Sequence, residues 1–149
     1  MIWTFDWIWS VTLIVFTMAV HVLVLAFVFR LIVAAHAREM GKGTWLRASV
    51  YVITFVLSAI ILHAFESACW GAAYLALGAL PDARAAMLYS LNAMTTFGHV
   101  TFELRETWKL MGALEALNGI LLCGLTTAFM FALLVQLDFA KDVRRTFDS

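Results

Sequence analysis

Four ionisable side chains lie inside long apolar stretches of this 149-residue sequence, where a charged group is costly to bury. His21 lies in the first stretch, His63 and Glu66 lie in the second, and Glu115 lies in the third. Residues three apart share one face of a helix, so His63 pairs with Glu66, and Glu115 pairs with Asn118. We expect His63 and Glu66 to tie their helix to its neighbours, with a proton-sensing role as the alternative.

Glu115 has two interpretations of the same kind. It either attracts cations or supports an ion-binding segment, or it forms hydrogen bonds with another helix or a neighbouring subunit.

No enzyme motif accompanies these residues. The sequence lacks the spacings of nucleophile elbows, zinc proteases and phosphate-binding loops, so we do not expect an enzyme. Cys69 and Cys123 lie in apolar runs without zinc-site spacing, which argues against a disulfide framework. The formal net charge is zero, so nothing indicates a nucleic-acid partner.

The composition predicts an all-α integral membrane protein embedded in a lipid bilayer. Hydrophobic residues make up 64% of the chain and charged residues 13%, and the mean hydropathy is +0.92. A helix of about 20 apolar residues crosses the hydrocarbon core. We therefore predict one membrane domain over residues 1–149, with spans at about 7–36, 48–80 and 108–137 and a short tail at 138–149.

The distribution of basic residues predicts the orientation of the chain. Because basic residues favour the cytoplasmic side, we expect the amino terminus outside and the tail inside. The basic residues on the cytoplasmic side are Arg30, Arg38, Lys42, Arg47, Lys141, Arg144 and Arg145.

The segment between the second and third spans does not have the pattern of an ordinary loop. Asp82 is a predicted N-cap for a helix at about 83–95, which is about 18 Å long and too short to cross. The polar stretch TTFGHV then begins at Thr95. This order predicts a re-entrant loop, with a helix lying on the membrane surface as the alternative. A re-entrant helix would point its negative carboxyl end towards a cation.

Residues 82–134 resemble the pore region of tetrameric potassium channels, which consists of an outer helix, a pore helix, a filter and an inner helix. Thr95-Thr96-Phe97-Gly98 resembles the start of the family's TTVGYGD, and the glycine spacing of residues 119–128 (GILLCGLTTA) is similar to that of its inner helix. Residues 60–135 resemble small bacterial ion channels more closely, which implies a bacterial plasma membrane. The first span lies outside the resemblance.

The resemblance implies a potassium-channel-like pore: a homotetramer that passively conducts monovalent cations, with no cofactor beyond the permeant potassium or sodium. The filter would occupy residues 95–101, with cations bound at Thr96, Phe97 and Gly98. The resemblance assigns the ion filter to Thr95, Thr96, Phe97, Gly98, His99 and Val100, and its support to Asn92, Thr101 and Glu115. It assigns the lining of the cavity to Ile120, Cys123, Thr127 and Phe131, and a hinge to Gly119 and Gly124. The two glycines equally suit close helix packing.

Departures from the family pattern lie in the outer half of the filter. Val100 replaces a glycine, Thr101 replaces an acidic residue, and Asn92 stands where a bracing glutamate is common. A left-handed backbone costs an L-residue about 1–2 kcal/mol, and a β-branched residue fits it badly. His99 replaces a tyrosine and titrates near neutral pH. These changes predict weakened selection of potassium over sodium.

Two alternatives remain. The first is a channel-like membrane protein that does not conduct. The second is a haem-binding anchor subunit of a respiratory enzyme, because His21 and His63 lie near mid-depth in adjacent spans.

Overall fold

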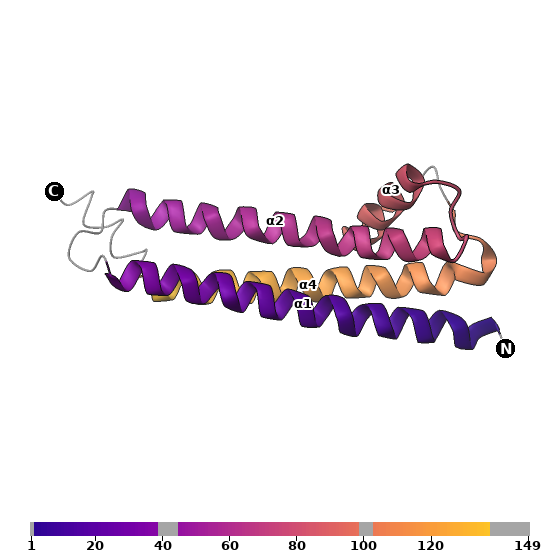
Figure 1. Ribbon diagram of the computed structural model, residues 1–149, viewed down its shortest axis with the longest axis horizontal. Helices are drawn as coiled ribbons and strands as arrows, with labels where there is room; N and C mark the ends of the chain where they lie inside the picture. The colour runs from indigo at the N-terminus through magenta and orange to yellow at the C-terminus, as the bar shows by residue number, and fades with distance from the viewer. Residues whose placement is uncertain (1, 39–44, 99–102, 138–149) are drawn as a thin grey trace. The chain divides into compact units, whose positions relative to one another are not determined.

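The computed structural model describes residues 2–38, 45–98 and 103–137. Within these ranges the chain is helical and forms no strand (Figure 1). The helices are α1 (Ile2–Arg38), α2 (Trp45–Ala76), α3 (Ala83–Met94), the short 3₁₀ helix η1 (Glu106–Trp108) and α4 (Lys109–Gln136). His99, Val100 and Thr101 and the predicted tail lie outside the described residues.

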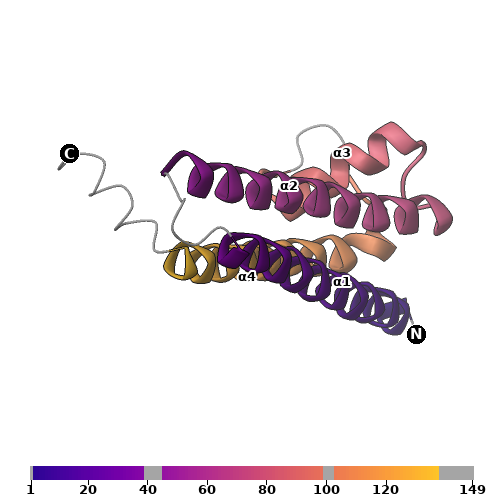
Figure 2. The ribbon, with the colours of Figure 1, turned by 60° about the vertical axis from the view of Figure 1, so that its left-hand side comes forward.

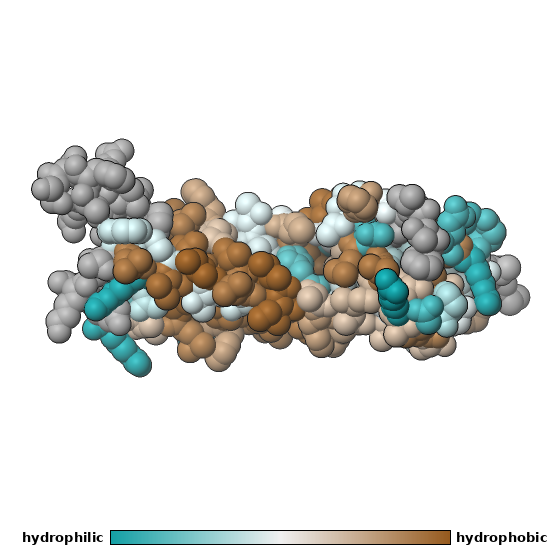
Figure 3. Space-filling view, turned by 90° about the horizontal axis from the view of Figure 1, so that it is seen from above, coloured by the Kyte–Doolittle hydropathy of each residue, from teal (hydrophilic) through white to brown (hydrophobic). Residues whose placement is uncertain are grey.

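Three of these helices are long and apolar enough to cross a membrane. They cover Phe5–Arg38, Trp45–Ala76 and Glu106–Gln136, with 34, 32 and 31 residues. Exposed large hydrophobic side chains cover much of the face drawn in Figure 3. These lengths and exposures indicate an integral membrane protein, as the composition predicted.

The chain divides into two compact units, and each long helix contributes residues to both. The first unit comprises residues 1–21 and 62–123 and contains all of α3. Its core includes Trp70 and Tyr74 of α2, Tyr89 and Met94 of α3, and Met111 of α4, which are all buried. In Figures 1 and 2, α3 lies beside the carboxyl-terminal part of α2. One face of the short helix thus packs against the core of this unit.

The second unit comprises residues 22–61 and 124–149. Phe55 and Leu133 are fully buried in it, and the Phe29 and Phe129 rings meet edge to face with centroids 6.4 Å apart. The His36 and Tyr51 rings also meet edge to face, with centroids 6.2 Å apart. Apolar and aromatic packing joins its helices.

The predicted helix boundaries near α3 are largely confirmed. The Asp82 carboxylate accepts a hydrogen bond of 2.9 Å from the Ala85 amide and caps the helix, as predicted. The second span ends at Ala76 rather than at residue 80, because the chain there forms a Schellman turn. Gly78 takes the left-handed position of that turn with φ 63°, and the Ala79 amide donates to the Tyr74 carbonyl.

Helix α4 closely approaches the backbone of α3 at Gly119. Gly119 is buried, and a Cβ placed on it would collide with the Met94 carbonyl oxygen and lie 2.7 Å from the Met94 Cα. Because these neighbours are backbone atoms, they cannot move aside cheaply. Gly119 therefore permits contact between α4 and the carboxyl end of α3, whereas nothing lies within 4 Å of a Cβ placed on Gly124.

Gly119→Ala is expected to lower the free energy of unfolding by about 1–3 kcal/mol, because the added methyl group overpacks this contact. The matched control, Gly124→Ala, should leave stability unchanged or raise it by up to about 1 kcal/mol through helix propensity. Reversible unfolding in detergent measures both variants. Equal effects at the two positions would contradict the proposed contact.

Candidate functional site

The candidate site is the segment Thr95–Gly98 together with the groups that hold the end of α3. Its central group is Glu115 of α4, whose side chain is fully buried. The Tyr74 hydroxyl of α2 donates to Glu115 Oε2 at 2.6 Å, and the Ser90 hydroxyl of α3 contacts Oε1. One carboxyl group thus joins α2, α3 and α4, which agrees with the hydrogen-bonding interpretation of Glu115. Its part in supporting a filter stays a prediction.

The Ser90 hydroxyl has two acceptors within reach. It lies 2.7 Å from the Ser67 carbonyl oxygen as well as against Glu115 Oε1, yet a hydroxyl carries only one proton. Both contacts are hydrogen bonds when Ser90 donates to Ser67 and the carboxyl of Glu115 donates to Ser90. A neutral Glu115 also suits a site from which water is excluded.

A further polar contact and an aromatic contact involve residues near this carboxyl group. The Asn118 side-chain amide donates to the Thr17 hydroxyl at 3.0 Å and connects α4 to α1. The Tyr89 ring meets the Tyr74 ring edge to face with centroids 5.3 Å apart, and burial raises the pKa of Tyr89 to about 12. The Tyr89 phenol therefore keeps its proton at neutral pH.

The chain after α3 forms a Schellman turn like the one after α2. The Thr96 amide donates to the Ala93 carbonyl and the Phe97 amide donates to the Asn92 carbonyl, both at 3.0 Å. Thr96 holds the left-handed position with φ 56°, where glycine is usual, and its hydroxyl donates to the Thr95 carbonyl at 2.7 Å. A β-branched residue in this conformation costs about 1–2 kcal/mol. Strain of this kind concentrates at functional sites.

The strained segment is exposed in the single chain. Thr95, Thr96, Phe97 and Gly98 are all exposed, and Gly98 has φ 95°, which an L-residue rarely adopts. A groove of about 580 Å³ borders the segment and is lined in part by Asn92, Thr96 and Gly98. Three of the predicted filter and support residues therefore lie at one surface.

The predicted inner-helix residues divide into buried and exposed positions. Gly119 packs against α3, which favours its packing role over a hinge. The remaining predicted positions, Ile120, Cys123, Gly124, Thr127 and Phe131, are exposed. Exposure suits a face that meets water, lipid or another subunit.

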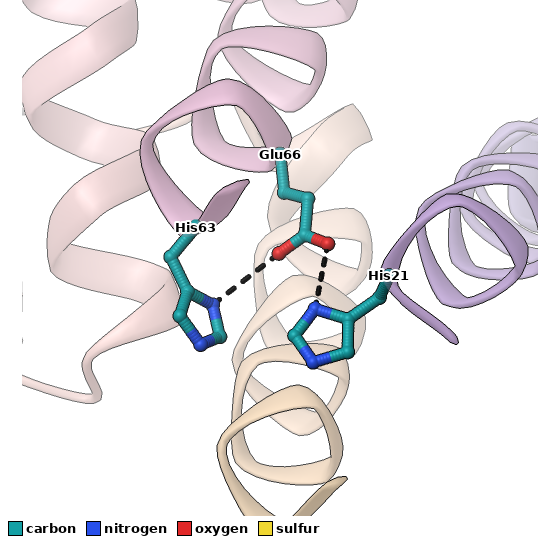
Figure 4. Close-up of side chains that lie close together, drawn as sticks. All are labelled: His21, His63 and Glu66. Carbon is teal, nitrogen blue, oxygen red and sulfur yellow. Dashed lines mark hydrogen bonds and ion pairs between the residues drawn. The ribbon is translucent and has the colours of Figure 1, made fainter. Parts of the chain in front are cut away.

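A second cluster brings together the two mid-helix histidines. His21 Nδ1 lies 2.8 Å from Glu66 Oε1, and His63 Nδ1 lies 3.3 Å from Glu66 Oε2 (Figure 4). The ring centroids of His21 and His63 are 5.1 Å apart. Glu66 thus ties α2 to α1, as expected for a residue that joins its helix to a neighbour.

Sequence reasoning did not identify Ser67, Tyr74 and Ser90 as partners of the site, nor His21 as a partner of Glu66. A small hydroxyl residue in an apolar helix is a weak signal, because it can also bond to its own backbone. Ser58 does so, donating to the Thr54 carbonyl at 2.8 Å. Only the packing of the helices distinguishes Ser90 from Ser58.

No protein-family model, curated protein or solved structure matches this chain. The resemblance to potassium channels therefore stays a prediction from the residues that carry it.

Ser90→Ala and Tyr74→Phe are each expected to lower the free energy of unfolding by about 1–3 kcal/mol, because each leaves a buried oxygen without its partner. Ser58→Ala is the matched control and should change stability by less than about 0.5 kcal/mol. Denaturant unfolding of the purified protein in detergent measures all three. If Ser90→Ala is as mild as Ser58→Ala, Glu115 does not hold α3.

Proposed function

We propose that this chain is one subunit of a homotetrameric cation channel that passively conducts monovalent cations, with weakened selection of potassium over sodium. One observation carries the proposal. A short helix is anchored by a buried carboxyl group to two candidate membrane spans, and its end presents the exposed segment Thr95–Gly98. That segment has the TTxG pattern of a cation filter.

A pore would explain why the polar backbone of Thr95–Gly98 is exposed. Irregular backbone within a membrane is tolerated only where it is buried in protein or lines a water-filled cavity. As a re-entrant pore helix, α3 would turn its negative carboxyl end towards the permeating cation. The Glu115 network would then hold the filter in place, and Asn92 would lie beside it.

The homotetramer follows from the geometry of a pore. A single segment such as Thr95–Gly98 cannot enclose an ion path, and closed cyclic symmetry is the usual solution. The exposed positions on α4 would line the cavity beneath the filter. Phe131 is 69% exposed, so four copies could form an apolar ring that gates by dewetting.

The haem-anchor alternative has less support from the geometry. A bis-histidine haem places the macrocycle between its two ligand rings. Here the ring centroids of His21 and His63 are only 5.1 Å apart, and both rings contact the Glu66 carboxylate. The other alternative is a channel-like protein that does not conduct, and measurements of ion conduction distinguish it from the proposed channel.

Ion selectivity is the first test of this proposal. With potassium on one side of a bilayer and sodium on the other, the reversal potential should lie close to zero, because Val100 and Thr101 replace residues that shape the outer filter. The combined replacement His99→Tyr, Val100→Gly and Thr101→Asp should move it away from zero, in the direction expected when potassium permeates better than sodium. Strong potassium selection by the unmodified protein would contradict the proposal.

Block from the cavity is the second test. Four Cys123 side chains around one axis would bind a soft metal ion, so cadmium or a thiol reagent applied to open channels should block the current. Cys123→Ser should remove the block, whereas Cys69→Ser, at a half-buried position on α2, should leave it intact. If block requires Cys69 instead, the proposed orientation of α4 is wrong.

A further inference from the structure

The cluster of His21, His63 and Glu66 has a composition and geometry that the channel function does not require. His21 and Glu66 are fully buried, and the His63 side chain is 26% exposed. The three residues come from α1 and α2, and all lie in the unit that contains α3. They also lie near the middle of two apolar helices, where an uncompensated carboxylate is costly.

One atom of this cluster lacks a hydrogen-bond partner. Glu66 Oε2 is buried and accepts no hydrogen bond from the described residues, although His63 Nδ1 lies 3.3 Å away. The other carboxylate oxygen already faces His21 Nδ1. Glu66 therefore has an unused acceptor directed at a second imidazole nitrogen, and its carboxylate lies between the two histidines (Figure 4).

The spacing of these atoms suits a small metal ion. The candidate ligand atoms of all three residues lie within 4.8 Å of one another. Ligands about 2.0–2.1 Å from a tetrahedral zinc ion lie about 3.4 Å apart, and the two nitrogen–oxygen distances in this cluster are 2.8 and 3.3 Å. Small side-chain shifts would therefore place three ligands around one ion without moving a helix.

We propose that His21, His63 and Glu66 form a binding site for Zn²⁺. Imidazole nitrogen and carboxylate oxygen are established zinc ligands, and three protein ligands leave the fourth tetrahedral position for one further ligand. Each histidine binds through neutral Nδ1, so metal binding displaces any proton that this nitrogen shares with Glu66. The bound ion neutralises the carboxylate and links α1 to α2. This site does not depend on whether the chain conducts ions.

Zinc binding to the full chain, purified in detergent and stripped with a chelator, tests the proposal. We expect one Zn²⁺ per chain, measured by elemental analysis and by titration with a fluorescent zinc indicator. His21→Gln or His63→Gln should each weaken binding at least about ten-fold, since even outer partners of a metal site contribute this much. His36→Gln is the matched control, because His36 also lies on α1 but meets the Tyr51 ring edge to face outside the cluster, and this variant should bind zinc normally.

Cobalt(II) provides a second readout on the unmodified protein, so the test does not depend on every variant folding. A tetrahedral site of nitrogen and oxygen ligands gives visible absorption bands, which zinc should displace at one equivalent. Absence of these bands, less than a tenth of an equivalent of zinc, or binding unaffected by both histidine substitutions would overturn the proposal. Binding lost in His36→Gln but retained in His21→Gln would also overturn it.

Discussion

The placement of α3 depends on one buried carboxyl group in α4. Within an apolar environment the oxygens of Glu115 have no water to replace a lost partner, so each must bond within the protein. Tyr74 and Ser90 provide those bonds from two other helices. One turn further along α4, Gly119 lets the backbone of α4 contact the backbone at the end of α3. A polar contact and a steric one therefore constrain the same helix.

The two Schellman turns show what is unusual about the segment that α3 presents. After α2 the left-handed position is Gly78, which adopts it without cost, whereas after α3 it is Thr96. The same backbone geometry is thus built once with the preferred residue and once with a poorly suited one. A threonine at such a position is consistent with a role for its hydroxyl or carbonyl group in the proposed ion path.

The sequence predicted the parts of the fold that depend on local patterns. Apolar stretches indicated three long helices, the Asp82 cap indicated the start of α3, and helical spacing paired His63 with Glu66. The partners of Glu115 and the approach of His21 to Glu66 were not predictable in this way. Apolar residues occur on every face of these helices, so the hydrophobic periodicity of the sequence does not show which faces pack against one another. The tertiary contacts had to come from the structure.

The most direct test of the central claim is potassium flux through the reconstituted protein. Liposomes loaded with potassium, diluted into a buffer free of both potassium and sodium and treated with a protonophore, take up protons only as fast as potassium leaves. If the chain forms a conducting pore, a pH-sensitive dye will report proton uptake at a rate that increases with the amount of protein. Empty liposomes will show no such uptake. Uptake no faster than in empty liposomes, with folded protein present in the membrane, would contradict the central claim.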